Sequence, residues 1–396
     1  MRLTFVNPVG GLGGAERVLL TAIRATVRAG HAAHLIACTD GPLLDHARAL
    51  GATADVLPMP PAMAATGDAG ALATLARTLT LAPAAWGYTK RLKAAVDATR
   101  PDLVHSNGLK THMLLWAAKP RAPIVWHLHD FVGQRKTASK ALKWTSGRTR
   151  RAIAISQAVA ADAKPVLPRT PIDVVMNAID TDRFTPGESD PSALDRLAGL
   201  PPLGTDVIRV GLIATYARWK GQDLFLRAAA KAAHRNPALA LRFFVVGGPI
   251  YHTAGSQWSE GELKALAEQL GIARRVGFVP FQSDPLAAFR GLDVVVHAST
   301  KPEPFGLTIV EAMACGKPVI VSAAGGALEI IQDNVSALAF PPSDESALAD
   351  RIGRLASDAG LRARVGAAAR DRAMSAFGEE RFAAELMQSY ARAVGT

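Results

Sequence analysis

Short apolar runs that indicate buried strands alternate along this chain with longer segments, and this alternation limits the possible folds more than any other feature. In the first half, the expected strands are Leu3 to Pro8, Ala33 to Thr39, Asp55 to Pro58, Leu103 to Ser106, Ile124 to His129, Ile153 to Ser156 and Asp173 to Asn177. Strands joined through intervening helices form parallel sheets. The pattern therefore predicts a doubly wound α/β sheet.

The second half repeats the same alternation. Its expected strands are Val207 to Ala214, Leu241 to Gly247, Val276 to Pro280, Asp293 to Ala298 and Pro318 to Ser322. Between the two series, the stretches 185–191 and 199–204 are rich in turn-forming residues, as expected of a domain connection. We expect two Rossmann-like domains, 1–190 and 191–376, followed by a helix in 377–396.

Composition is consistent with two cytoplasmic domains. The chain has 396 residues, 49% of them hydrophobic, which is enough for two cores. No segment approaches the roughly 18 apolar residues of a membrane span, and Met1 to Phe5 leads directly into a strand instead of a signal peptide. Cys38 and Cys315 fall in different expected domains, so we expect no disulfide between them.

The net charge of +11 predicts an acidic partner, which charge alone does not identify. A nucleoside diphosphate, a nucleic acid and an anionic membrane surface would all fit. Nucleic acid is the least favoured of the three, because no zinc finger or base-reading module accompanies the basic residues.

The segment from Ser299 to Gly326 carries the strongest chemical signal. Glu303 is expected in a turn after a buried strand, and Glu311 about two turns into the helix that follows. Ionised carboxylates accept hydrogen bonds from vicinal hydroxyls, while the helix start near Gly306 offers unpaired N–H groups to a phosphate. A nucleotide sugar has both features. The alternative is that the two glutamates are ordinary surface charges.

Glu303, Glu311 and the following Ala312, Gly316, Pro318-Val319-Ile320 and Gly325-Gly326 resemble the signature of family 4 glycosyltransferases. These are retaining enzymes of the GT-B fold, in which two Rossmann-like domains face each other across a cleft. The resemblance implies that Glu303 holds the donor sugar and Glu311 the ribose. It implies that Gly306, with its neighbours Phe305 and Leu307, holds the diphosphate.

The same resemblance implies how the domains divide the work. The amino-terminal domain would bind the acceptor, which would be a glycan, a lipid-linked or a small molecule. The carboxy-terminal domain would bind the nucleotide-sugar donor, and the helix in 377–396 would cross back to the first domain. Envelope polysaccharide or glycolipid synthesis is the expected setting. No metal and no cofactor are expected, because positive side chains and helix amides take the place of a divalent cation.

A glycine-rich loop, Gly10 to Glu16, follows the first strand. Glycines allow the backbone to approach a ligand closely. By resemblance, Gly13 and Gly14 approach the donor phosphates. The loop is also close to a dinucleotide fingerprint, with Asp40 as the ribose-binding acid, but Glu16 stands where a third glycine or alanine belongs. Hydride transfer is therefore a weak rival, and it leaves the segment containing Glu303 unexplained.

A basic loop follows the first strand of the second domain. Arg218 and Lys220 are suited to neutralising a departing diphosphate. Lys220 and Gly221 match the family's lysine-glycine pair. The family's glycine-arginine pair is replaced here by Ala214 and Thr215, so Arg218 is the candidate for supplying the missing charge. The alternative is an ordinary solvated loop.

Trp126 to Asp130 ends a strand with two histidines on the same face. His129, at the very end of the strand, matches the family's active-site histidine, and Asp130 is the candidate for orienting it. His127 is expected to be an ordinary core or surface residue with its hydrogen bonds satisfied.

Residues 136–151 form a basic segment that includes Trp144. Such a segment suits peripheral contact with a membrane. The alternative is a solvated helix face with Trp144 in the core.

Two enzyme classes other than a transferase remain open at this point. A nucleotide-sugar epimerase or a hydrolase would share both the architecture and the donor contacts. A retaining transferase needs no nucleophile from the protein in the family's usual account, because the departing diphosphate helps to remove the acceptor proton. Charge stabilisation and positioning would then be the protein's contribution.

Overall fold

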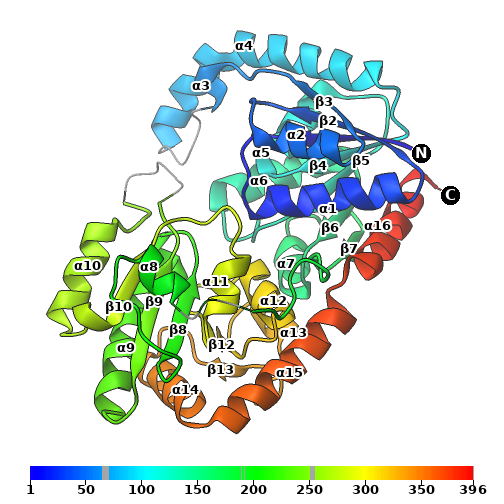
Figure 1. Ribbon diagram of the computed structural model, residues 1–396. Coiled ribbons are helices and arrows are strands. Elements are labelled where there is room, and N and C mark those ends of the chain that lie inside the picture. The colour runs from blue at the N-terminus through cyan, green and yellow to red at the C-terminus, as the bar shows by residue number, and fades with distance from the viewer. Residues whose placement is uncertain (65–70, 189, 191, 250–254, 396) are drawn as a thin grey trace. The chain divides into compact units, whose positions relative to one another are not determined.

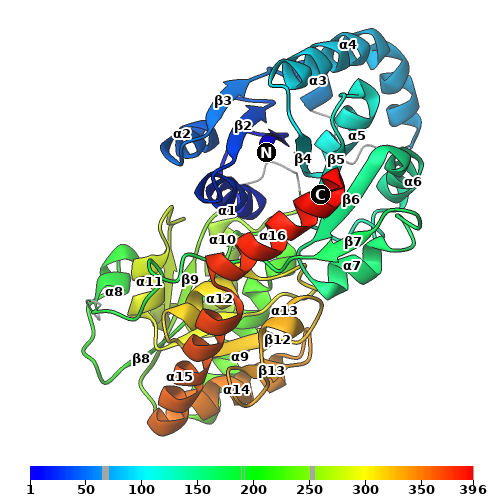
Figure 2. The ribbon, with the colours of Figure 1, turned by 90° about the vertical axis from the view of Figure 1, so that its right-hand side faces the viewer.

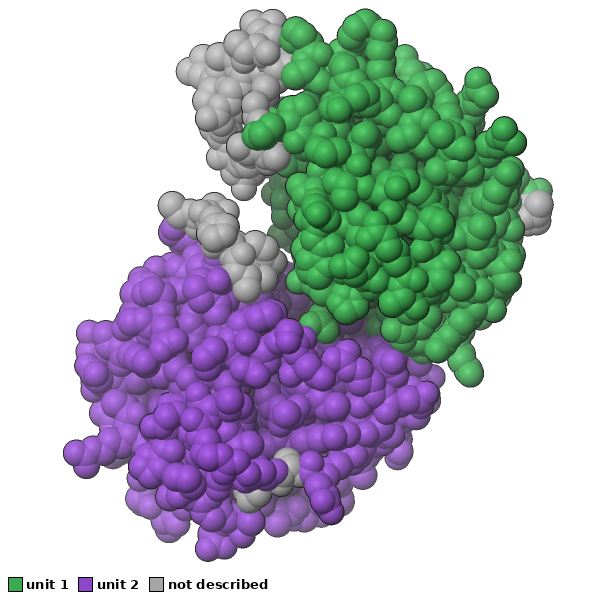
Figure 3. Space-filling view, turned by 45° about the horizontal axis from the view of Figure 1, so that its top comes forward, with its two compact units in different colours: residues 1–178, 379–396 green, residues 179–378 purple. Residues whose placement is uncertain are grey.

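The computed structural model describes residues 1–64, 71–188, 190, 192–249 and 255–395, without the side chains of 62, 64, 71–82, 136 and 137. The chain forms two compact units, coloured separately in Figure 3. Unit 1 contains Met1–Ala178 together with Glu379–Thr396, and unit 2 contains Ile179–Gly378. Each unit is built on one parallel sheet.

Unit 1 has a seven-stranded parallel sheet in the order β3-β2-β1-β4-β5-β6-β7 (Figure 1). Its strands are β1 (Arg2–Asn7), β2 (Ala32–Ala37), β3 (Thr53–Val56), β4 (Leu103–Asn107), β5 (Ile124–Leu128), β6 (Thr149–Ala154) and β7 (Ile172–Val174). The seven expected strands are therefore confirmed. Only β6 begins clearly earlier than expected, because its first half, Thr149 to Arg151, is polar and lacks an apolar signal.

Helices cover both faces of this sheet, as the doubly wound pattern requires. Helices α1, α2 and α16 lie on one face, and α4, α5 and α6 on the other (Figure 2). The helices of unit 1 are α1 (Gly14–Arg28), α2 (Pro42–Ala49), α3 (Pro61–Ala64), α4 (Ala71–Ala98), α5 (Leu109–Ala118), α6 (Lys136–Thr145), α7 (Gln157–Ala163) and α16 (Glu379–Val394), with the short η1 (Ser146–Arg148). The last helix of the chain thus packs on the first unit, against α1 and β4 to β6.

Unit 2 has a six-stranded parallel sheet in the order β10-β9-β8-β11-β12-β13. Its strands are β8 (Ile208–Ile213), β9 (Leu241–Val246), β10 (Val276–Val279), β11 (Val294–His297), β12 (Val319–Ser322) and β13 (Leu338–Phe340). The five expected strands are confirmed. The edge strand β13 was not expected, because three residues are too few to give a periodic pattern.

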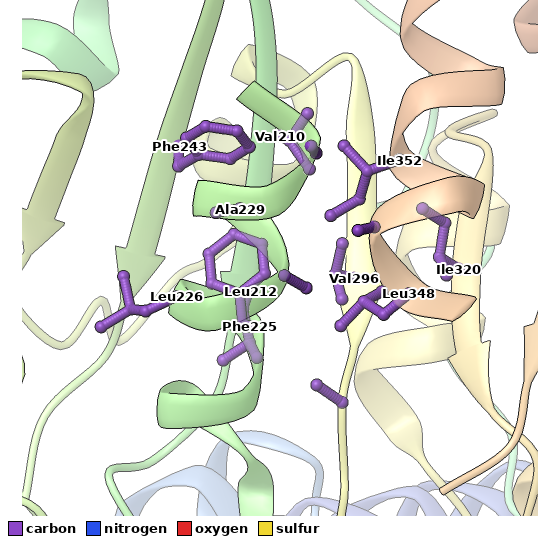
Figure 4. Packing of buried hydrophobic residues seen from close by; sticks show 14 of the residues in the cluster. Val210, Leu212, Phe225, Leu226, Ala229, Phe243, Val296, Ile320, Leu348 and Ile352 are labelled. Carbon is purple, nitrogen blue, oxygen red and sulfur yellow. The ribbon is translucent and has the colours of Figure 1, made fainter. Parts of the chain in front are cut away.

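The core of unit 2 lies between this sheet and helices α9 and α14 (Figure 4). Alternate residues of β8, Val210 and Leu212, point into it beside Phe225 and Ile352. The helices of unit 2 are α8 (Ala193–Leu197), α9 (Gln222–Arg235), α10 (Glu260–Gln269), α11 (Leu286–Gly291), α12 (Leu307–Ala314), α13 (Ala327–Ile330), α14 (Glu345–Ser357) and α15 (Ala359–Ala376), with η2 (Arg218–Lys220) and η3 (Ala273–Arg275).

The division between the units falls at Ala178 and Ile179, earlier than the expected position near 190. Side-chain contacts explain the difference. Arg290 of α11 donates hydrogen bonds to the backbone and the hydroxyl of Thr185, at 3.0 and 2.9 Å, and Phe184 packs edge-on against Phe289. The turn-rich stretch therefore belongs to unit 2. Ser189 and Pro191, part of the expected connection, lie outside the described residues.

A buried ion triad fixes α8 on the other face of the unit 2 sheet. The carboxylate of Asp195, 0% exposed, pairs with Arg209 of β8 at 2.9 Å and Arg242 of β9 at 2.8 Å. Both arginines are also buried, and they reach backbone carbonyls of Leu203 and Pro201. The triad thus joins a helix to two neighbouring strands.

We predict that Asp195→Ala lowers the free energy of unfolding by roughly 3–5 kcal/mol, because it leaves two guanidinium groups buried without their carboxylate. Urea denaturation would measure the change. Asp190→Ala is the matched control, since Asp190 and its partner Arg196 are both exposed and their pair should contribute little. Equal midpoints for the Asp195 variant and the control would contradict the structural role of the triad.

Candidate active site

The sheet of unit 2 has a topological switch point, where the chain reverses its direction of winding. From β8 the chain adds β9 and β10 on one side, then returns to add β11, β12 and β13 on the other. Strands β8 and β11 are neighbours, and the loops that leave their carboxyl ends diverge. These two loops carry Lys220 and Glu303.

Glu303 is the centre of a buried polar cluster. Its side chain is only 8% exposed, and one oxygen, Oε2, accepts three hydrogen bonds. Lys220 Nζ donates at 2.7 Å, Ser299 Oγ at 2.8 Å and His297 Nε2 at 3.0 Å. Within the described part of the chain, no hydrogen bond is recorded to Oε1 of this carboxylate. The three donors thus converge on one oxygen of the carboxylate, Oε2.

The Glu303 carboxylate is held in its ionised form. Burial alone would raise its pKa, but the charge of Lys220 and the hydrogen bond from His297 outweigh that effect. The pKa of Glu303 lies well below its usual range as a result. At physiological pH the group is therefore a hydrogen-bond acceptor only.

Close backbone approaches bring these loops together. Gly221 has φ +76°, and a Cβ there would lie 2.0 Å from the carbonyl oxygen of Ala298. Gly325 has φ +69°, and a Cβ there would lie 2.5 Å from the carbonyl oxygen of Glu303. No side chain fits at either position. The two glycines let the loops after β8 and β12 pack against the loop after β11.

Helix α12 starts directly beside Glu303. Gly306 is its N-cap with φ +117°, a conformation that suits glycine, and the N–H groups of residues 306–308 have no hydrogen-bond acceptor within the described part of the chain. Leu307 is partly exposed, while Phe305 is buried with its ring against Phe377. Glu311 is buried in the second turn of the helix, as expected from the sequence.

Arg218 does not join this cluster. Its guanidinium pairs with Glu262 at 2.7 Å and lies over the ring of Trp258, 3.8 Å from the centroid. Lys220, two residues later in η2, is the side chain that reaches Glu303. The structure therefore places the two basic residues of this loop in different surroundings.

Unit 1 has its own polar group at the carboxyl ends of β1, β4 and β5. The glycine-rich loop follows β1, and Gly13 is the N-cap of α1, directly before Gly14. Glu16 Oε2 accepts the backbone N–H of Gly13 at 3.0 Å. The glutamate that departs from the dinucleotide fingerprint is thus a helix-capping residue here.

A chain of hydrogen bonds runs from Glu16 to His129. Asn7 Nδ2 donates to Glu16 Oε1 at 3.3 Å and to the carbonyl oxygen of Val9 at 2.7 Å. Asn107 Nδ2 donates to Asn7 Oδ1 at 2.8 Å. His129 Nε2 lies 2.6 Å from Asn107 Oδ1.

The direction of this chain determines the tautomer of His129. A carboxylate and a carbonyl can only accept, so the amide of Asn7 must point its nitrogen at Glu16 and Val9. Asn107 must then donate to Asn7 and present its own oxygen to the imidazole. His129 consequently carries its proton on Nε2, and Nδ1 is an acceptor. Burial lowers the pKa of His129 to about 4, so the ring is neutral at physiological pH.

Asp130 was expected to orient His129, and this expectation is wrong. The Asp130 carboxylate pairs with Arg135 and accepts the backbone N–H of Phe131 at 2.8 Å. Neighbouring residues leave a strand on opposite sides, which takes Asp130 away from the imidazole. Asn107 performs the orienting role instead.

His127 is in the core, one of its two expected placements, but the expectation that its ring is hydrogen-bonded is wrong. Neither ring nitrogen has a partner within the described residues. Its ring lies between two other imidazoles, with centroids 5.1 Å from His105 and 4.1 Å from His129. His112 is also buried and stacks on Trp126. The described part of unit 1 therefore contains three buried histidines, with the half-buried His129 beside them.

In the basic segment, Trp144 is not in the core. Its side chain is 72% exposed and lies against Trp116 of α5, with ring centroids 4.3 Å apart. Leu142 and Thr145 are the buried residues among the described side chains of α6. The side chains of Lys136 and Thr137 lie outside the described residues. The alternative that placed Trp144 in the core is wrong, and membrane contact stays a prediction.

The described residues offer few groups for a disulfide, a metal site or a membrane span. Cys38 and Cys315 are free, buried and in different units. Among the described residues, no three His, Cys, Asp or Glu side chains are grouped closely enough to hold a metal ion. No helix in the described ranges has the length and apolarity needed to span a bilayer.

Sequence reasoning missed four polar residues of these clusters, Asn7, Asn107, His297 and Ser299. Each stands at or just after the carboxyl end of a strand and is buried. A buried polar side chain at that edge of a parallel sheet is the signal that could have identified them.

Comparison with known proteins relates both units to one class of enzyme. The family model "Glycosyltransferase Family 4" matches residues 12–183, and "Glycosyl transferases group 1" matches residues 203–372. The D-inositol 3-phosphate glycosyltransferase of Salinispora arenicola is 34% identical over 330 residues, which cover 77% of this chain and 71% of that protein. For the Mycobacterium tuberculosis protein of the same name, the match has 37% identity and covers 57% and 44% of the two chains.

Solved structures agree with the sequence matches. HepE of Anabaena, solved with UDP-glucose, has a TM-score of 0.81 and 25% identity, and the match covers 99% of each chain. Its structure with UDP and glucose gives a TM-score of 0.80 and 26% identity. The sucrose-phosphate synthase of Thermosynechococcus elongatus, at 20% identity and a TM-score of 0.78, shares the fold.

We predict that acid destabilises the protein below about pH 6.5. Burial is the main reason that the pKa of His129 falls to about 4 and that of His105 to about 3, and it takes the pKa values of His112 and His127 well below the ordinary range. At a pH between these lowered pKa values and the ordinary histidine pKa of about 6.5, the unfolded chain binds protons that the native chain does not. The free energy of unfolding should therefore fall, by about 1 kcal/mol per histidine from about pH 6.5 to 5.5.

Urea denaturation across this pH range would measure the loss. His127→Leu is the informative variant, because it removes one buried imidazole whose nitrogens have no partner and should make the pH dependence shallower. An unfolding free energy that stays constant between about pH 7.5 and 5.5 would show that the histidines are not buried as described.

Asn107→Asp should raise the pKa of His129 above its value of about 4, because a carboxylate at hydrogen-bond distance stabilises the imidazolium. An NMR titration of the histidine ring protons would follow the change. Asn334→Asp, on the surface of unit 2, adds the same charge and should leave the titration unaltered. Identical titrations of His129 in both variants would exclude the hydrogen bond to Asn107.

Proposed function

This chain belongs to glycosyltransferase family 4 and has the GT-B fold, and from that premise we propose that it transfers a sugar from a nucleoside-diphosphate sugar to an acceptor hydroxyl with retention of the anomeric configuration. The observation that carries the proposal is the buried, ionised Glu303 beside Lys220 and the start of α12. A carboxylate that can accept hydrogen bonds from sugar hydroxyls therefore lies next to N–H groups that can donate hydrogen bonds to a phosphate.

The donor sugar is proposed to bind Glu303. Its Oε2 is occupied by Lys220, His297 and Ser299, which fix the plane of the carboxylate. Oε1 then accepts a sugar hydroxyl. Because the pKa of Glu303 is well below its usual range, the carboxylate keeps this role throughout the physiological pH range.

The diphosphate is proposed to bind Lys220 and the start of α12. The ammonium of Lys220 has three N–H donors and gives one to Glu303, so others remain for a phosphate oxygen. The backbone N–H groups at Gly306, Leu307 and Thr308 and the positive end of the helix dipole add to this attraction. Both features stabilise the charge that develops on the departing diphosphate. Glu311, buried in the same helix, is the proposed partner of the ribose.

Unit 1 is proposed to bind the acceptor. In its tautomer, His129 can accept a hydrogen bond from a hydroxyl group at Nδ1. The ring is neutral because burial lowers its pKa to about 4. Gly13 and Gly14 have no side chains, so a ligand can approach the backbone of the loop after β1 closely. Arg218 has no place in this scheme while it is paired with Glu262.

The proposed reaction breaks the bond between the anomeric carbon and the diphosphate and forms a bond to the acceptor oxygen on the same face of the sugar. The departing phosphate oxygen takes the acceptor proton. The protein contributes positioning and charge, and no metal ion is required in this proposal.

The identity of the donor base and of the acceptor rests on the relatives. HepE was solved with UDP and with UDP-glucose, so a uridine nucleotide is the first donor to test. The Salinispora relative is named for D-inositol 3-phosphate, so a phosphorylated polyol is the first acceptor. An envelope glycan or glycolipid is the second.

A hydrolase or an epimerase acting on nucleotide sugars is the alternative reading of the same donor site. Incubation with donor alone separates the classes, since without an acceptor a hydrolase would consume the donor and an epimerase would bring it to an equilibrium mixture with its epimer. NMR of the anomeric proton in the transferase product would report retention or inversion.

We predict that UDP-glucose raises the melting temperature of the protein, because a ligand at about 100 times its Kd stabilises the folded state by about 2.7 kcal/mol. GDP-, ADP- and dTDP-sugars serve as competitors in the same thermal-shift assay. Lys220→Ala should abolish the shift and lower turnover by about 10²- to 10³-fold, since it removes a donor to the leaving group.

Lys301→Ala is the matched control. Lys301 lies in the same segment as Glu303, is exposed, and makes no ion pair or hydrogen bond within the described residues. Its variant should keep both the shift and the activity. A Lys220 variant that retains wild-type turnover would refute the assignment, and the absence of a shift with every nucleotide sugar at millimolar concentration would refute the donor site.

A further inference from the structure

An arginine-lined pocket lies at the edge of the unit 1 sheet opposite to His129. It has a volume of about 560 Å³, and Arg148, Arg150, Arg151, Arg169 and Arg392 contribute to its wall. Arg148 immediately precedes β6, Arg150 and Arg151 are in its first half, and Arg169 precedes β7. These are the amino ends of parallel strands, whereas Asn107 and His129 lie at the carboxyl ends.

Positive charge in this pocket greatly exceeds negative charge. Arg151 and Arg392 share one carboxylate, that of Asp173, at 3.0 and 3.3 Å. Arg148, Arg150 and Arg169 have no ion pair and no hydrogen bond among the described residues. The five guanidinium groups thus have one carboxylate partner among the described residues, that of Asp173, and it pairs with two of them.

Three exposed arginines elsewhere in the chain illustrate the contrast, because each has an acidic partner. Arg48 pairs with Asp45, Arg196 with Asp190, and Arg235 with Asp350. What distinguishes the pocket is that it gathers five guanidinium groups around one hollow, three of them without a carboxylate partner among the described residues. The described function uses none of these residues.

We propose that this pocket binds the phosphate groups of an anionic ligand, at a site separate from the nucleotide-sugar site of unit 2. The guanidinium fork matches two oxygens of one phosphate, and several arginines around one hollow suit more than one phosphate or a phosphate with its neighbours. Because the arginines are largely exposed, the attraction depends on ionic strength and is strongest at low salt.

Two sources of such phosphates fit the pocket. One is a soluble polyphosphate-bearing molecule. The other is the headgroup layer of an anionic lipid surface, and the exposed Trp144 on α6, which continues through η1 to Arg148, is a side chain that suits the interface of a bilayer. The two sources share the same recognition chemistry, and experiment can separate them.

The test compares two triple variants with the same loss of charge. The pocket variant combines Arg148→Gln, Arg150→Gln and Arg169→Gln. The control variant combines Arg48→Gln, Arg196→Gln and Arg235→Gln, which are all exposed. Calorimetry with inorganic tripolyphosphate tests the soluble source, and co-sedimentation with phosphatidylcholine vesicles, with and without phosphatidylglycerol, tests the lipid source.

We expect the wild-type protein and the control variant to bind one of these probes, and the pocket variant to bind it at least about tenfold more weakly. Binding to phosphatidylglycerol vesicles with a blue shift of tryptophan emission identifies the lipid source. Tripolyphosphate binding alone identifies the soluble one. The proposal is overturned if the wild type binds neither probe, or if both triple variants lose binding equally, which would indicate attraction by net charge.

The outcome does not depend on the sugar-transfer reaction. Tripolyphosphate bound at Lys220 in unit 2 would be retained by the pocket variant, and that result would also overturn the proposal. The thermal shift with UDP-glucose, measured on both variants, reports separately on the donor site. Should the triple pocket variant fail to fold, the single variants Arg148→Gln and Arg169→Gln provide the same comparison.

Discussion

A buried carboxylate that must stay ionised, Glu303, is the constraint on which the arrangement of its surroundings in unit 2 depends. Removing a carboxylate from water is costly unless other donors replace the water. Lys220, His297 and Ser299 supply these donors from the segments that follow β8 and β11. The segments come close enough because Gly221 lets a carbonyl oxygen occupy the space of a side chain. The arrangement proposed to bind the donor thus follows from stabilising one buried charge.

Unit 1 also has polar side chains at the carboxyl ends of its parallel strands, but the side chains nearest His129 are neutral amides. Its chain of amides from Asn7 to Asn107 begins at groups that can only accept, and this fixes the proton of His129 at the other end. Burial keeps the ring uncharged, as the lowered pKa of His129 shows. One unit therefore presents fixed charges, which suit an anionic donor. The other presents a neutral acceptor, which suits a hydroxyl group.

Much of the fold could be predicted because strands and helices are encoded by neighbouring residues. The twelve expected strands are present, and α16, Glu379–Val394, lies within the expected range of 377–396. The failures have local causes as well. The three residues of β13 are too short a run to be periodic, and the first half of β6 is polar. The boundary between the units lies earlier than expected because Arg290 binds Thr185, and the turn-rich composition of this stretch does not reveal that contact.

The sequence by itself determined the two doubly wound sheets, the family signature and the loops that carry Lys220, Glu303 and His129. Only the tertiary structure decided the partners of these side chains. Lys220 meets Glu303 across 83 positions, and Arg218 turns to Glu262 across 44. Periodicity is a property of adjacent residues, whereas a side-chain contact depends on how distant loops pack. For the same reason, the sequence showed that the three arginines near β6 belong to a basic segment. Only the fold brings them together with Arg169 and Arg392 in one pocket.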